Sequence, residues 1–175
     1  MRWSPCGGKV HTEEGESPYA CACREAREEL DLEITAQDLH LTADVSEHAY
    51  GGAGHWLIFL FEVKRRLREC PPQHREGTFC FFGRDRIPSL HIPQTDREII
   101  WPLFWKHRGG FFAAHWKWFS DGRTEWTTEE SRPVLNPRPS TLIPAAAPRL
   151  ARPPALASIT SVMTDRNLRP RGVRR

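Results

Sequence analysis

Residues 8–32 read GKVHTEEGESPYACACREAREELDL, and this stretch carries the strongest structural signal in the chain. Its second half predicts an amphipathic helix over 18–30. Ser17 is a favourable N-cap, and Pro18 suits the first helical position. One apolar stripe recurs at helical spacing through Tyr19, Cys23, Ala26 and Leu30.

The acidic side chains of this helix repel one another. Glu25, Glu28 and Glu29 are three or four residues apart and therefore lie close together on the helix surface. The helix dipole also disfavours anions in the last turn, where Glu28 and Glu29 lie. Each unfavourable charge costs about 0.3–1 kcal/mol of helix stability, and Arg24 and Arg27 offset part of this cost. One interpretation is a solvated charged face. The other is a site for a hard cation such as Mg²⁺ or Mn²⁺, which prefer oxygen ligands.

The loop before the helix favours the second interpretation. Gly7, Gly8 and Gly15 bracket a turn-rich stretch that delivers Glu16 to the start of the helix. Glycine adopts backbone shapes that other residues resist, and it lets the backbone approach a ligand closely.

These residues resemble the signature of the Nudix hydrolases. That signature is Gly, five residues, Glu, seven residues, Arg-Glu, an aliphatic residue, any residue, Glu-Glu, any residue, Gly and an aliphatic residue. From Glu16 onward this chain is similar to it, with Arg24-Glu25-Ala26-Arg27-Glu28-Glu29 following seven residues later. Residues 3–10, WSPCGGKV, resemble the segment that leads into the family's box.

Two positions depart from the family pattern. Seven residues separate Gly8 from Glu16, so we expect a two-residue insertion near Thr12 and Glu13. Glu14, at the nominal spacing, is the weaker candidate for the loop glutamate. Asp31 stands where the family has glycine just past the helix, and Asp tolerates the left-handed conformation expected there.

The resemblance implies a Mg²⁺-dependent hydrolase that cleaves a pyrophosphate bond in a nucleoside diphosphate linked to another moiety, with Mn²⁺ as the alternative cation. The implied metal ligands are Glu16, Glu25, Glu28 and Glu29. The implied catalytic residues are Arg24, Glu28, Glu29 and Glu76, and the implied substrate-binding residues are Gly8 and Lys9. Arg24 would orient a glutamate by charge-assisted hydrogen bonds, and a carboxylate would take a proton from the attacking water. The other interpretation of Glu76 is a surface loop glutamate.

The remaining pattern predicts further strands and one more helix. Strands are expected at residues 39–43, 55–63 and 78–82, and the near-continuous apolar run at 55–63 indicates a strand covered on both faces. Thr95 and Glu98 form a capping-box pattern for a helix towards His107, which Pro102 should kink or split and Gly109-Gly110 should close. The aromatic stretch 111–119 favours a core or interface over base stacking.

By the resemblance, the fold class is α+β: an α/β/α sandwich with a mixed sheet between helices. Such a fold normally has strands before the box, whereas only seven residues precede Gly8. We therefore expect a Nudix domain at 1–130 that lacks N-terminal strand(s). Residues 131–175 hold about half of the prolines, nine arginines, no lysine and no aromatic residue, which predicts a Pro/Arg-rich disordered tail.

Composition bounds the remaining expectations. Five cysteines without a CxxC pair predict neither a zinc site nor a disulfide framework, which is typical of a reducing compartment such as the cytoplasm. No apolar run is long enough to span a bilayer. The expected partner is a nucleotide or a nucleoside diphosphate derivative. A membrane and nucleic acid are not expected, apart from a weak attraction of nucleic acid to the basic tail, and a homodimer is left open.

Two other functions remain open from the sequence. One is a catalytically impaired Nudix-fold module that binds a nucleotide or a protein without turning it over. The other is an unrelated interaction protein whose acidic helix is merely solvated. The intact Glu25, Glu28 and Glu29 argue against the binding module, and the interaction protein predicts no rise in melting temperature with Mg²⁺.

Overall fold

A mixed four-stranded sheet forms the centre of the molecule in the computed structural model, which describes residues 2–49, 54–65, 67, 69–71, 77–134 and 162–165. Its strands are β2 (Leu39–His48), β3 (His55–Val63), β5 (Phe111–Trp118) and β6 (Thr124–Arg132), in the order β3-β2-β5-β6. The β2–β5 pair is parallel and the other pairs are antiparallel. The predicted mixed sheet is confirmed.

A second, smaller sheet holds the beginning of the chain. Its strands are β1 (Trp3–Pro5), β4 (Phe79–Phe81) and β7 (Val162–Asp165), with β7 in the middle and antiparallel to both neighbours. One short strand therefore precedes the box. β7 lies within the range predicted to be a disordered tail, most of which falls outside the described residues.

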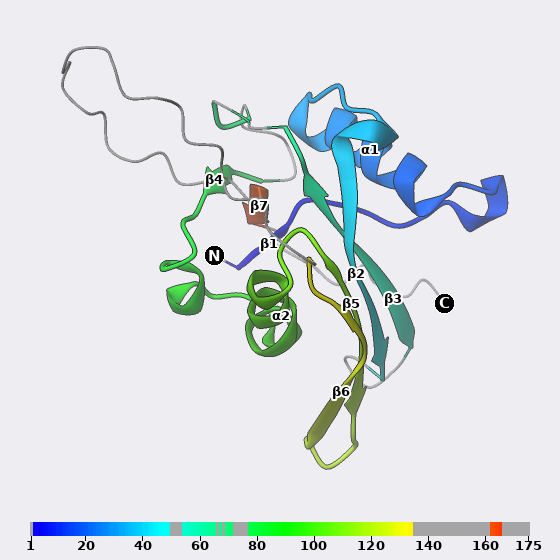
Figure 1. Cartoon of the computed structure of the whole chain (residues 1–175), viewed down its shortest axis with the longest axis vertical. Coiled ribbons are helices and arrows are strands. Elements are labelled where there is room, and N and C mark those ends of the chain that lie inside the picture. Colours follow the sequence, from blue (N-terminus) through cyan, green and yellow to red (C-terminus); the bar gives the residue numbers. More distant parts are fainter. Residues whose placement is uncertain are drawn as a thin grey trace, which may run out of the picture.

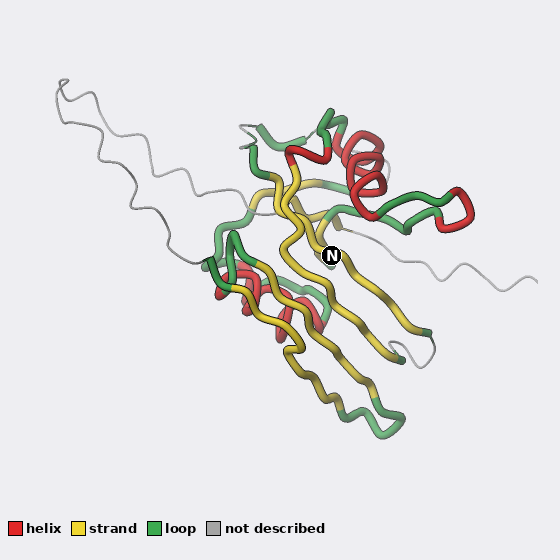
Figure 2. The backbone as a smooth tube through the Cα atoms, turned by 45° about the vertical axis from the view of Figure 1, so that its right-hand side comes forward, coloured by secondary structure: helices red, strands yellow, loops and turns green. Residues whose placement is uncertain are grey.

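Two helices lie on opposite sides of the four-stranded sheet: α1 (Pro18–Leu30) on one side and α2 (Trp101–Lys106) on the other (Figures 1 and 2). Successive side chains of a strand point to opposite faces of the sheet, so apolar residues of β3 can pack against a helix on each side. Phe61 packs with the α1 cluster, whereas Leu60 packs with the α2 cluster. The expected α/β/α layering is present.

A bulge in β2 lets one strand serve both cores. The register between β2 and β3 shifts between Leu41 and Ala43. Leu39, before the shift, packs with Ala26 of α1. Val45, after the shift, packs in the larger core on the other face. The extra residue redirects the apolar side chains without ending the strand.

Among the described residues, short 3₁₀ helices connect these elements: η1 (Thr12–Glu14), η2 (Ala36–Asp38) and η4 (Ile87–Ser89). A π-helical turn, η5 (Asp96–Ile100), leads directly into α2. No helix in the described part of the chain is long and apolar enough to cross a membrane.

The strand predictions hold in outline and differ in detail. The strand expected at 39–43 continues to His48, the one at 55–63 has the predicted bounds, and β4 falls within 78–82. The expectation that 55–63 is covered on both faces holds only for the second half of the strand, where Leu60 and Phe61 pack against clusters on opposite sides of the sheet. β3 is an edge strand, and its residues His55–Leu57 are exposed. The aromatic strand β5 contributes to the core, as favoured, with Phe112 and Trp116 fully buried.

The predicted capping box at Thr95 was also wrong. The backbone of Thr95 is already helical, and its hydroxyl donates to the carboxylate of Glu47 on β2 rather than to its own helix. A buried acceptor on another element thus overrides the local capping pattern. The helix changes from π to α geometry one residue before Pro102, in agreement with the expected break, and it ends at Lys106, before the glycine pair.

Candidate active site

Helix α1 has the ends that its sequence predicts. Ser17 caps it, with its Oγ accepting a hydrogen bond from the backbone N–H of Ala20 at 3.1 Å, and Pro18 is its first residue. Asp31 follows the helix with φ 51° and ψ 39°, the left-handed conformation expected where the family has glycine. The two departures from the family pattern therefore leave the helix itself intact.

The longer box loop, residues 7–17, still delivers Glu16 to the helix. The extra residues form the 3₁₀ turn η1, which Gly15 closes with φ 69°. The carboxylate of Glu16 accepts a hydrogen bond from the backbone N–H of His11 at 2.9 Å. Glu14, the weaker candidate, points to solvent with 77% of its side chain exposed. The structure thus favours Glu16 as the loop glutamate.

Arg24 lies at the centre of the box carboxylates. Its Nε and Nη2 donate to the two oxygens of Glu16 at 2.7 and 3.0 Å. Its Nη1 donates to Glu25 at 2.6 Å and to Glu28 at 3.2 Å. Nη2 also donates to the carbonyl of Lys9 at 3.1 Å. A planar guanidinium suits such paired contacts, and here it joins loop and helix.

Two glycines bring the loop backbone against the remaining glutamates. The N–H of Gly7 donates to the buried carboxylate of Glu29 at 3.2 Å. A Cβ added to Gly8 would overlap the carboxylate of Glu25. Glycine is therefore required at residue 8 by a close approach between the loop and the helix.

This arrangement shifts the pKa values of the groups involved. Hydrogen bonds from Arg24, and then from the His11 backbone, lower the pKa of Glu16 to about 2. The same Glu16 contact raises the pKa of Arg24 above its ordinary value. Burial, followed by the charge of Glu16, raises the pKa of the Cys21 thiol to about 11. Glu16 and Arg24 are thus charged across the physiological pH range, and Cys21 is a neutral thiol.

The composition of the site fits a hard divalent cation. The site holds four carboxylates and one guanidinium, which contacts three of them, so excess negative charge is carried by oxygen atoms. No three His, Cys, Asp or Glu side chains of the described residues are arranged to hold a metal ion. Arg24 accounts for this, because it holds three of the carboxylates while Glu29 turns towards Gly7.

Two of the predicted site residues, Lys9 and Glu76, come from outside the box loop's glutamates and helix α1. The ammonium of Lys9 lies 5.3 Å from the centre of the Trp56 ring, beside the box. Glu76 lies outside the described residues. The structure thus brings together, along α1 and the loop before it, Gly8, Lys9, Glu16, Arg24, Glu25, Glu28 and Glu29.

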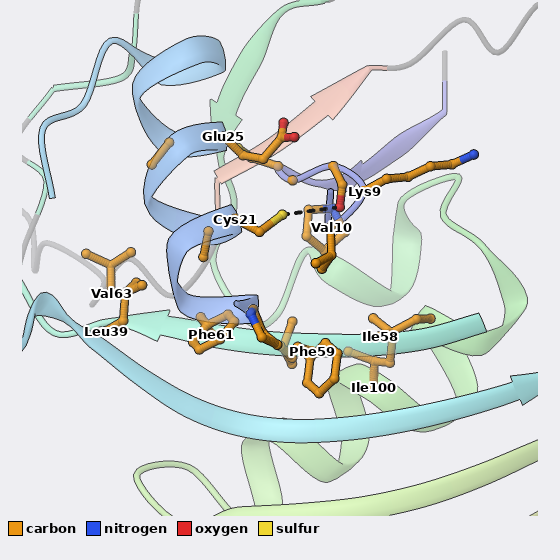
Figure 3. Close-up of a pocket in the computed structure, with 18 of the residues that line it drawn as sticks. Lys9, Val10, Cys21, Glu25, Leu39, Ile58, Phe59, Phe61, Val63 and Ile100 are labelled. Carbon is orange, nitrogen blue, oxygen red and sulfur yellow. Dashed lines mark hydrogen bonds between the residues drawn. The ribbon is translucent and has the colours of Figure 1, made fainter. Parts of the chain in front are cut away.

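A cavity of about 580 Å³ opens beside this cluster. Figure 3 shows Val10 and Cys21 opposite Phe59 and Phe61 of β3, whereas the charged ends of Lys9 and Glu25 point away from that strand. Residues of η5 and α2 complete the wall, namely Asp96, Ile100, Trp101 and Phe104. The volume falls in the usual range for ligand pockets, about 300–1,000 Å³.

Two buried carboxyl groups, Glu47 on β2 and Asp96 on η5, were not predicted from the sequence. Glu47 accepts hydrogen bonds from the Thr95 hydroxyl and, at 3.0 Å, from Trp118 Nε1. Burial, followed by the charge of Glu47, raises the pKa of Asp96 to about 7. The pattern Thr95-Asp96-Arg97-Glu98 was interpreted as a helix cap, and nothing local marks Asp96 as buried.

Comparisons with known proteins agree with this geometry. The family model described as the NUDIX domain matches residues 1–100. The solved structure of the mutator MutT protein from Bacillus halodurans is similar in fold, with a TM-score of 0.54 and 18% sequence identity. The similarity covers 73% of this chain and 97% of that one. A search of curated proteins gave no match.

Proposed function

The chain belongs to the Nudix family, and we propose that it hydrolyses a pyrophosphate bond in a nucleoside diphosphate linked to another moiety, using Mg²⁺ held by the box glutamates. The observation that carries this proposal is the Arg24 cluster, which joins Glu16, Glu25 and Glu28 in one network. An acidic helix that was merely solvated would not need a loop glutamate tied to it by two hydrogen bonds.

Glu25, Glu28 and Glu29, with Glu16 beside them, would hold the cation. When bound, Mg²⁺ supplies neutralising charge for the anionic pyrophosphate and makes an attached water more acidic. The chain itself supplies orientation. Arg24 fixes the loop to the helix, and the N–H of Gly7 holds the carboxylate of Glu29 at 3.2 Å. A fixed set of carboxylates needs little reorganisation at the moment of reaction.

Glu28 is the best candidate for the general base. Its side chain is 52% exposed, whereas those of Glu16 and Glu25 are 11% and 12% exposed. A base must reach the attacking water and pass its proton to solvent, which an accessible carboxylate can do. Lys9, beside the cavity, supplies positive charge for the phosphates. Glu76 remains a second candidate base on the sequence pattern alone.

We also propose a cellular compartment and domain limits for this chain. The five cysteines form no disulfide with one another in the structure, which supports a reducing compartment such as the cytoplasm. We place the Nudix domain at 1–130, two residues before the end of β6 at Arg132, and the tail at 131–175.

The decisive experiment is a substrate panel with Mg²⁺ or Mn²⁺, read out by product mass. The panel contains nucleoside triphosphates, ADP-ribose, dinucleoside polyphosphates and nucleotide sugars. Glu28→Gln combined with Glu29→Gln should abolish metal-dependent release of phosphate or monophosphate. The matched control is Glu13→Gln with Glu14→Gln, two exposed loop glutamates. Full activity in the Glu28/Glu29 double variant refutes the metal assignment, and binding without turnover on every substrate supports the binding-module alternative.

A further inference from the structure

The two edges of the four-stranded sheet are protected to different degrees. The sheet ends in β3 on one side and in β6 on the other. The pairing of β6 with β5 is interrupted by a register shift, and β6 carries charged residues at Glu125, Glu129, Glu130 and Arg132. β3 has no Asp, Glu, Lys, Arg or Pro among its first seven residues, and residues 55–60 pair with β2 without a shift. Charged side chains and bulges are the usual protection of a free strand edge, so the beginning of β3 is unprotected.

The beginning of β3 also exposes large apolar side chains. Trp56 and Leu57 are 42% and 57% exposed. Because they are adjacent in a strand, they point to opposite faces of the sheet. Helix α1 covers the other half of the strand, where Tyr19 packs edge-on against Phe61 with 4.7 Å between the ring centroids. Figures 1 and 2 show β3 as the outermost strand of this sheet, with its beginning extending away from α1.

A second copy of the chain provides a strand that fits this edge. An unpaired edge presents backbone N–H and C=O groups that a further strand can bind. The free half of β3 carries no carboxylate, ammonium or guanidinium for a charged partner to match, so an uncharged apolar strand fits it best. Antiparallel pairing about a two-fold axis at Leu57 places Leu57 opposite Leu57 of the second copy, and Trp56 opposite Ile58 of the second copy. Directly opposed aromatic and β-branched side chains stabilise each other across a strand pair.

We propose that two copies of this chain associate through antiparallel pairing of β3 over residues 55–59, which joins their two four-stranded sheets into one. A two-fold interface uses the same patch on both copies, so one unprotected edge is sufficient. The new strand pair satisfies backbone groups of the edge and covers Trp56 and Leu57. The ammonium of Lys9 lies 5.3 Å from the centre of the Trp56 ring, so the box loop lies beside this interface. The inference concerns association and does not depend on the proposed hydrolysis.

The first test is sedimentation velocity of the full chain over a range of concentrations. A reversible equilibrium between monomer and dimer is expected. A chain that stays monomeric up to about 1 mM overturns the proposal and leaves the edge to a strand of another protein. Leu57→Lys should weaken the dimer at least about tenfold, because it sets two ammonium groups opposite each other across the axis. Thermal melts at a concentration where the chain is monomeric check that this variant folds.

Trp126→Lys on β6 is the matched control, because Trp126 is also exposed, by 44%, on an edge strand. The dimer of this variant should be as stable as that of the unmodified chain. Equal weakening by Trp126→Lys and Leu57→Lys overturns the assignment of the interface to β3. A dimer that Leu57→Lys leaves unchanged overturns it as well.

A cysteine at the two-fold axis tests the register with a second readout. In Leu57→Cys the two new thiols lie opposite each other, and glutathione disulfide takes one hydrogen from each, giving one intermolecular disulfide and two molecules of glutathione. The control is Glu125→Cys on β6, where the side chain is 65% exposed, and the unmodified chain measures crosslinking through its own cysteines. The Leu57→Cys dimer should form at least about tenfold faster than the Glu125→Cys dimer, because only opposed Cβ atoms reach disulfide geometry. Equal rates overturn the pairing about Leu57.

Discussion

Gly8 lies so close to Glu25 that a Cβ on residue 8 would overlap the Glu25 carboxylate. Glu25 cannot simply move away, because Arg24 holds it at 2.6 Å. The loop and helix α1 are therefore fitted to each other at the proposed cation site.

Substitution of Gly8 tests this fit. Gly8→Ala should lower the free energy of unfolding by about 1–3 kcal/mol through overpacking, and it should reduce turnover. In a Glu25→Ala background the same substitution should have little further effect, because the overlapping carboxylate is gone. Thermal melts of the four chains in this cycle measure the coupling. Equal losses in both backgrounds contradict the contact.

Arg24 should not be replaceable by lysine. Arg24→Lys keeps the positive charge but loses the planar fork that contacts Glu16, Glu25 and Glu28, so we expect turnover to fall by about 10–100-fold and the apparent Mg²⁺ affinity to weaken. Arg27→Lys is the matched control, because Arg27 is exposed on the same helix. Kinetics over a Mg²⁺ titration measure both quantities. Similar values for the two variants would show that charge alone is sufficient.

Substitutions of Glu16 and Glu14 should have different effects on activity and melting temperature. Glu16→Gln loses an ionised partner of Arg24 and should lower both activity and melting temperature at pH 7. Glu14→Gln, at an exposed position, should leave both unchanged. The pKa of Glu16 is depressed to about 2, so its stabilising contribution is fully present above its ordinary pKa of 4.5. That contribution is lost as pH falls towards 2. A larger effect of Glu14→Gln would reverse the assignment of the loop glutamate.

Asp96 should make stability fall as pH rises. Its pKa is raised from 3.8 to about 7, so its neutral form is favoured in the folded state. Stability is then highest below pH 3.8 for this group and declines up to about pH 7, by about 4 kcal/mol in total. Asp96→Asn should remove most of this decline between pH 4.5 and 7.5.

Glu47→Gln provides the second variant for the same question. It removes the charge that raises the pKa of Asp96, so the pH midpoint of the decline should move to lower pH. Urea unfolding at a series of pH values measures the free energy in each chain. A decline that persists unchanged in Asp96→Asn would assign it to another group.

Helix α1 could be predicted because its signals are local. Ser17, Pro18 and the apolar stripe define the helix, and the observed bounds match the prediction. The strand at 55–63 was found for the same reason, since a long β-branched and aromatic run favours a strand wherever it lies. Its edge position was not predicted, because the pairing partners of a strand lie elsewhere in the sequence.

The sequence by itself determined the family, the helix and the order of its carboxylates, since these depend on spacing within about 25 residues. Only the tertiary structure decided that Arg24 gathers Glu16, Glu25 and Glu28, and that Thr95 bonds to Glu47, 48 residues away, instead of capping its helix. It also decided that Asp96 is buried beside the cavity. Burial and long-range hydrogen bonds depend on which elements pack together, and the local pattern around Asp96 carries no trace of that packing.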